Sequence, residues 1–234
     1  MKTIILLFFL SVAVIAFAGC QSAPTTTNTN IHTNTAIVNS NANSMMNLNG
    51  NTMMNGNSMS NSGGMMNRSD IKSSPNAASQ PYDLQFIDTM SAHHKSAIDM
   101  AEMTVKKSNN AELKTFAQKI IDDQKKEIAQ MKDWREKWYA GKPEAMNMEM
   151  SGMNDSMKMM MGDEMKKMEA ATGKDFDIHF LDMMTPHHAG AVTMAKEALM
   201  KAEHPEIKTL ANQIIKAQEA EIKMMNEWKK RWSK

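Results

Sequence analysis

The sequence predicts an all-α protein: an antiparallel four-helix bundle built from two copies of one helical hairpin. The stretch from Tyr82 to Trp138 recurs from Phe176 to Trp232, with many identical residues at an offset of 94 and no gap. Within each copy, apolar residues recur at steps of three and four, as in a helix with one buried face. No period-two run of β-branched residues indicates a strand. Two such hairpins can bury their apolar stripes against each other in a bundle.

The beginning of the chain has the pattern of an export signal. An apolar run from Ile4 to Phe17 is too short to span a membrane, so we interpret residues 1–19 as a signal peptide. The small residues before Cys20 resemble a bacterial lipoprotein box. We therefore expect Cys20 to carry a lipid that anchors the protein to an outer membrane or cell surface. The alternative is an ordinary secretory signal, and both interpretations place the protein outside the cytoplasm.

Residues 20–80 have the composition of a disordered tether. They are rich in Asn, Ser, Thr, Gly and Met, and have too few large apolar residues to offset the entropy of ordering. Thioethers in such a segment have no core to fill, so we interpret them as weak capture ligands for a soft metal ion. These methionines are Met45, Met46, Met53, Met54, Met59, Met65 and Met66.

The first hairpin repeat covers residues 81–142 and the second covers residues 174–234. In the first, we expect helices over Tyr82–Lys107 and Ala111–Tyr139, separated by a Ser-Asn-Asn break with the chemistry of a helix cap. In the second, Pro205 marks the start of the longer helix, because proline suits a first helical turn.

Apolar stripes run along the longer helix of each repeat, and Met131 and Met225 continue them as core residues. Four polar residues interrupt these stripes halfway along: Gln124, Glu127, Gln218 and Glu221. A buried polar group needs a partner, so we expect these residues to meet the histidines described below. The alternative is exposure to solvent at the edge of the stripe.

A methionine-rich connector, residues 143–173, joins the repeats. We expect one short helix over 164–172, capped by Asp163. Met146, Met148, Met150 and Met153 lie among Asn, Glu, Ser and Gly, and we expect them to be exposed ligands. The alternative is a methionine-coated helix that packs on the bundle. The predicted auxiliary capture residues are Met146, Met148, Met150, Met153, Met157, Met160 and Met161.

Each repeat carries one chemical constellation at the same spacing. The first contains Asp88, Met90, His93, His94 and Met100, and the second contains Asp182, Met184, His187, His188 and Met194. Residues three or four apart share a helix face, so imidazole and thioether lie together, and Met184 with His188 has a good chelating spacing. This donor set suits Cu(I) and Ag(I). The alternative is hydrogen-bonded interior histidines.

Two geometric expectations follow for these residues. Adjacent histidines on a helix point about 100° apart, so one of each pair should face the bundle and the other a neighbouring helix or solvent. Asp88 and Asp182 could orient an imidazole through a hydrogen bond, or could favour the helix dipole.

Charge and cysteine content exclude several classes of function. The chain has 27 basic and 26 acidic residues, so it has no basic field for nucleic acid. Its single cysteine excludes a thiolate metal cage and an internal disulfide.

The run from Asp182 to His188, with Met194-Ala195 and Gln218-x-x-Glu221, resembles the signature of the family called domain of unknown function 305. The resemblance covers about Pro81 to Lys234, and the first copy departs from it at Ala92 and Lys95. It implies a ferritin-like bundle that binds copper or silver and acts in metal sequestration and resistance. The implied ligands are His187, His188, Met184 and Met194, with His93, His94, Met90 and Met100 as their equivalents.

We therefore expect a membrane-anchored protein that buffers or transfers Cu(I) and catalyses no reaction, with Cu(II) or Ag(I) as alternative metals. Expected partners are copper ions, a copper exporter or another periplasmic copper protein, and a second copy in a homodimer. A ferritin-like di-metal oxidase is disfavoured, because its Glu-x-x-His motif is absent from the sequence. A purely structural bundle with methionine as packing filler is the remaining alternative.

Overall fold

The computed structural model describes residues 72–161 and 163–234. The predicted signal peptide, the lipid attachment at Cys20 and the seven tether methionines lie outside the described residues. In the described part of the chain, all regular structure is helical, and no helix is both long and apolar enough to span a bilayer.

Four long helices form the two predicted hairpins: α1 (Tyr82–Lys107), α2 (Ala111–Tyr139), α5 (Gly173–Lys201) and α6 (Pro205–Trp232). The predicted ends of α1 and α2 are confirmed. The Asn110 side chain caps α2 by accepting hydrogen bonds from the backbone N–H groups of Glu112 and Leu113. Pro205 lies in the first turn of α6, as predicted from its fixed φ.

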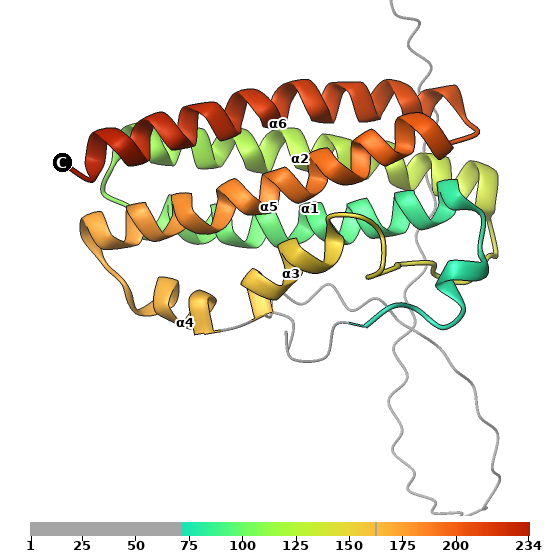
Figure 1. Cartoon of the computed structure of the whole chain (residues 1–234), viewed down its shortest axis with the longest axis horizontal. Helices are drawn as coiled ribbons and strands as arrows, with labels where there is room; N and C mark the ends of the chain where they lie inside the picture. The colour runs from blue at the N-terminus through green and yellow to red at the C-terminus, as the bar shows by residue number, and fades with distance from the viewer. Residues whose placement is uncertain (1–71, 162) are drawn as a thin grey trace, which may run out of the picture. The chain divides into compact units, whose positions relative to one another are not determined.

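The hairpins pack as an antiparallel four-helix bundle (Figure 1). Helices α1 and α5 run side by side in opposite directions. The bonds of Asp83 show this, since Asp83 lies at the start of α1 and bonds to Glu203 and His204 just beyond the end of α5. Helices α2 and α6 cover one side of this central pair, and the connector covers the other.

Two buried apolar clusters fill the bundle, one toward each end of the α1–α5 pair. The predicted stripes of α2 and α6 enter these clusters, and Met131 and Met225 are core residues as predicted. Trp134 stacks on Trp138 at 5.3 Å between ring centroids, and the matching pair Trp228 and Trp232 stacks at 5.4 Å. The duplication in the sequence is therefore a duplication in packing.

The connector differs from its prediction in two respects. It contains two short helices, α3 (Met153–Met161) and α4 (Asp163–Ala170), where one was expected. Its first part is also paired with residues assigned to the tether, because Ser74 N–H donates to Met146 O at 2.8 Å and Met148 N–H donates to Ser73 Oγ at 2.9 Å. The prediction of a tether is thus wrong for residues 72–80, which also include the 3-10 helix Ala77–Ser79.

Candidate metal centre

Four histidines meet inside the bundle where α1 crosses α5. His93 and His187 face each other across this contact, with ring centroids 3.8 Å apart. His94 and His188 are their neighbours in sequence, and all four side chains are at most 1% exposed. We call these four residues the histidine quartet.

The outer two histidines each meet a glutamate of their own hairpin. His94 Nε2 lies 2.6 Å from Glu127 Oε2, and His188 Nε2 lies 2.9 Å from Glu221 Oε2. This follows from the angle of about 100° between adjacent residues on a helix, since one ring reaches the other hairpin and the next reaches the partner helix. The expected contact with histidines is therefore found for Glu127 and Glu221, and not for Gln124 and Gln218. The alternative of a solvent-facing histidine is wrong.

These contacts assign a tautomer to three of the rings. A carboxylate only accepts, so Nε2 of His94 and of His188 carries the proton and donates it to glutamate. The Ser96 hydroxyl donates to the backbone oxygen of His93 at 2.7 Å, and so it accepts from His187 Nε2 at 2.8 Å. When these rings are neutral, each keeps a free lone pair on Nδ1.

Those lone pairs have no protein partner. Nδ1 of all four quartet residues is buried without a hydrogen bond, and His93 lacks a partner at Nε2 as well. The side-chain oxygens of Gln124 and Gln218 are also buried and unpartnered. Because orphaned buried polar atoms cost free energy, such a concentration indicates a site whose donors are kept free for a ligand.

Burial keeps the facing rings neutral. Removal from water lowers the pKa of both His93 and His187 well below 6.5, and the neighbouring histidines lower it further. Protons therefore compete weakly for these nitrogens at neutral pH, and the lone pairs stay available.

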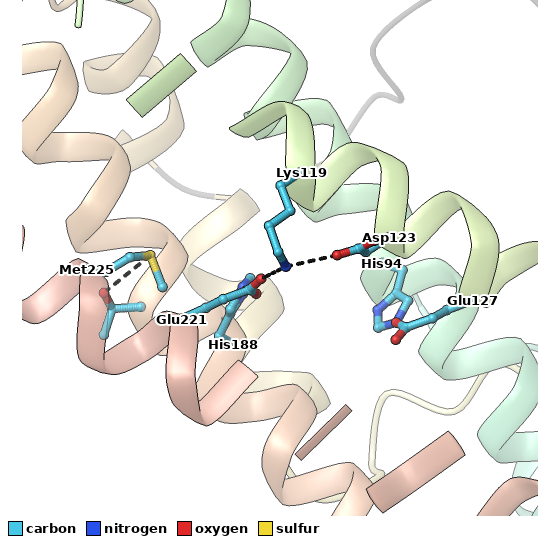
Figure 2. A network of polar contacts seen from close by, with 8 residues as sticks. His94, Lys119, Asp123, Glu127, His188, Glu221 and Met225 are labelled. Carbon is cyan, nitrogen blue, oxygen red and sulfur yellow. Dashed lines mark hydrogen bonds and ion pairs between the residues drawn. The ribbon is translucent and has the colours of Figure 1, made fainter. Parts of the chain in front are cut away.

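The glutamate of the second repeat has an additional partner. Lys119 of α2 reaches across to Glu221 Oε1 at 2.9 Å and also bonds Asp123 at 2.9 Å (Figure 2). Burial raises the pKa of Glu221, but the bonds to His188 and Lys119 more than offset this and lower it overall. Glu221 is thus held ionised beside His188. Sequence reasoning missed Lys119, because its partner is far away in the chain.

The structure divides the predicted methionine ligands differently from the sequence. Met90 and Met194 lie in one buried cluster, and Met100 and Met184 lie in the other. Ten residues of helix span about 15 Å, so the two methionines of one repeat cannot bind one ion together. The predicted sets of four ligands per repeat are therefore wrong as single sites. Each histidine pair instead lies between the two apolar clusters, each of which contains methionines from both repeats.

The two aspartates do not orient imidazoles. Asp88 accepts from Arg135 Nε at 2.7 Å and from Ala145 N–H at 2.8 Å, and Asp182 forms an ion pair with Lys229, which matches Arg135 in the repeat. Five residues rotate a helix by about 500°, which turns each aspartate roughly 140° away from the first histidine of its pair. Of the two alternatives for these residues, the imidazole contact is therefore wrong, and this angle is the reason.

The connector methionines are not exposed as predicted. Met148, Met150 and Met153 are at most 7% exposed, Met157 is buried as well, and Met146 is half-buried. The side chains of Met160 and Met161 lie outside the described part of the structure. The polar residues between these methionines predict exposure, but one of them, Asn147, bonds to α1 and helps to hold the segment against the bundle.

No group of three or more His, Cys, Asp or Glu side chains is arranged to hold a metal ion within the described residues. A metal at the quartet would therefore combine imidazole with thioether. His94 has Met90 one turn before it, and His188 has Met184 in the same relation; all four side chains are fully buried.

Comparison with known proteins gives the chain its family. It matches the family described as domain of unknown function (DUF305) over residues 83–229. It is 38% identical to CopM in its Cu(II)-bound form, with a TM-score of 0.55, over 65% of this chain and 99% of that one. CopM has also been solved with Cu(I), with Ag and in the apo form.

Two further relatives are more distant or shorter. A DUF305 protein from Streptomyces coelicolor is 28% identical, with a TM-score of 0.57, over 64% of this chain and 92% of that one. An uncharacterised protein of Acanthamoeba polyphaga mimivirus is 44% identical over 50 residues, which span 21% of this chain and 33% of the viral protein. With the family matched across both hairpins and the quartet, this chain belongs to the DUF305 family.

Proposed function

We propose that this protein binds Cu(I), and the similarly soft Ag(I), through its buried histidines and methionines, and that it buffers or transfers the metal outside the cytoplasm. The observation that carries the proposal is the set of buried, unpartnered Nδ1 atoms in the histidine quartet. Imidazole together with thioether is a donor set that selects Cu(I) over hard cations.

In this proposal the primary ligands are His94 with Met90 and His188 with Met184. Glu127 and Glu221 hold the Nε2–H of each ring, which fixes ring orientation and increases the basicity of Nδ1. His93 and His187 lie between the two positions and offer further nitrogen donors. The metal-bound forms of CopM, a member of the same family, support the choice of metal.

The remaining elements of the proposal concern location and exchange. A lipid on Cys20 would hold the protein at a membrane surface, where it could exchange copper with an exporter or another periplasmic protein. A Cys20→Ala variant should leave the membrane fraction of the producing cells. Retention of this variant in the membrane fraction would exclude the lipid anchor.

The competing explanation is a purely structural bundle in which methionine fills space, and the burial of the connector methionines favours it. Titration of Cu(I) under reducing conditions against a chromophoric chelator separates the two. We expect His94→Ala and His188→Ala each to weaken binding at least about tenfold, as loss of a metal ligand or its support does.

The matched control is His179→Ala. His179 is half-buried on α5 and bonds the backbone oxygen of Glu164 at 3.1 Å, away from the quartet. The proposal predicts wild-type affinity for this variant. Equal affinity in all three variants, or the absence of tight binding in the wild-type protein, would support the structural bundle instead.

A further inference from the structure

The first half of the connector is fixed to α1 by polar bonds. Ala145 N–H donates to Asp88 Oδ2, Asn147 N–H donates to Thr89 Oγ1 at 2.9 Å, and the Asn147 side chain donates to Gln85 Oε1 at 2.8 Å. These acceptors occupy a short stretch of α1 directly before Met90. None of the bonds involves a methionine, so the segment is positioned independently of its thioethers.

A contact between two glycines then seats α3 against α5. A Cβ atom on Gly190 would lie 1.7 Å from Ser156 Oγ and 2.4 Å from the backbone oxygen of Gly152. Such distances admit only glycine at this position. The matching position in the first repeat is Ser96, so the bundle itself does not need glycine there. Gly190 therefore serves the docking of the connector.

This docking buries three thioethers in one apolar cluster. Met153 and Met157 lie one turn apart on α3, Met194 lies one turn beyond Gly190 on α5, and all are at most 3% exposed. Between residues 146 and 168 every large apolar side chain is methionine. Leucine would fill an anchored core with a smaller loss of side-chain entropy, so packing alone does not explain this choice.

We propose that Met153, Met157 and Met194 form a thioether site for a soft monovalent cation, completed by the docking of α3 on α5. This inference rests on the proposed function and adds a second type of site to the histidine quartet. Three thioethers without imidazole or carboxylate select Cu(I) or Ag(I) and reject Mg²⁺ and Ca²⁺. The connector is then part of a defined site instead of a loose capture segment.

The test follows Ag(I) binding by NMR in the mature protein, with the methionine methyl groups labelled with ¹³C. We expect the methyl signals of Met153, Met157 and Met194 to shift in the same titration step. The double variant Met153→Leu/Met157→Leu should lose one equivalent of Ag(I) and the Met194 shift. The matched control is Met165→Leu/Met168→Leu, which alters buried methionines of α4 and should keep both.

A second variant tests the docking itself. Gly190→Ala leaves every methionine and histidine in place but forces α3 off α5, so it should lose the same equivalent of Ag(I). Ala189→Ser, at the exposed neighbouring position, should retain it.

The inference is overturned if the Met153 and Met157 methyl signals stay unmoved, or if the double leucine variant keeps its full capacity, while His94 and His188 still respond to Ag(I). Absence of any response at the quartet would instead contradict the proposed function. The two failures are therefore distinguishable in one titration.

Discussion

The two repeats place the same Met-His-His motif and the same glutamate on matching helices, yet they give these groups different surroundings. His94 and His188 both bond a glutamate. Of these two glutamates, Glu221 is the one that a lysine of the described residues, Lys119, also bonds. The position in the second repeat that matches Lys119 is the uncharged Gln213. Duplication thus supplies a common framework, and the electrostatics of the two sites differ.

A second difference lies three residues after the first histidine of each pair. Ser96 in the first repeat accepts a hydrogen bond from His187, whereas its counterpart Gly190 has no side chain and receives the connector. His93 is consequently the quartet member with both ring nitrogens unpartnered. The first repeat departs further from the family signature, but its His93 has both ring nitrogens without a hydrogen-bond partner and so available to a ligand.

The largest expected effect is a dependence of stability on pH, caused by His93 of the first repeat and His187 of the second. The pKa values of His93 and His187 lie well below 6.5, because burial and then the other histidines oppose their protonation. Below pH 6.5 the unfolded chain binds protons that the native rings do not. The contribution of these rings to the free energy of unfolding should be complete above this pH. It should decrease by about 1.4 kcal/mol per pH unit for each ring as pH falls below it.

Urea unfolding of the metal-free protein between about pH 7 and about pH 5 measures this slope. His93→Gln should reduce the slope by the contribution of one ring, and His187→Gln should do the same. An unchanged slope in both variants would show that the facing rings are protonated in the native state.

Substitution of the matching aspartates near the starts of α1 and α5 should lower the stability of the protein by different amounts. Asp83 accepts from the backbone of Glu203 and of His204 and from His204 Nδ1 at 2.6 Å, so Asp83→Ala should cost about 3 kcal/mol. Its counterpart Asp177 has an unpartnered oxygen, and burial raises its pKa despite a bond to Ser108. Asp177→Ala should cost less than about 1 kcal/mol. Equal losses in thermal unfolding would contradict the difference.

Ser96→Ala should have an intermediate effect. It leaves His187 Nε2 buried without a partner, which costs about 1–2 kcal/mol. Ser91→Ala is the control, since the Ser91 hydroxyl makes only a weak contact of 3.8 Å with Met131 Sδ. Chemical denaturation of both variants measures these losses of unfolding free energy. A loss in Ser91→Ala as large as that in Ser96→Ala would show that the bond between Ser96 and His187 does not stabilise the protein.

Lys119→Gln should have the smallest effect on stability. The lysine side chain is 55% exposed, so its ion pairs are screened and their loss should cost less than about 1 kcal/mol. The substitution introduces the residue found at position 213 and should make the responses of His94 and His188 to Ag(I) more alike in NMR. A wider difference between the two histidines would show that Lys119 does not cause the asymmetry.

The long helices were predictable because their signals are local. The Asn110 cap, Pro205 in a first turn and stripes at steps of three and four are all read within one helix. The contacts of Glu127 and Glu221 with histidines were also accessible, because polar residues that interrupt an apolar stripe need partners.

The connector and the ligand grouping were not predictable in the same way. The polarity of Asn147 predicts exposure, but Asn147 is 8% exposed and bonds Gln85, which is 62 residues away in sequence. The antiparallel crossing of α1 and α5 groups Met90 with Met194, which no analysis of a single helix reveals. Both features depend on contacts between distant segments.

We propose above all that the unpartnered Nδ1 atoms of the quartet bind the metal. Two-dimensional ¹H–¹⁵N NMR of histidine-labelled protein during Ag(I) titration tests it directly. We expect the Nδ1 signals of His94 and His188 to shift, while their Nε2 signals stay typical of N–H groups bonded to carboxylate. Binding of Ag(I) with unmoved Nδ1 signals at both residues would contradict it.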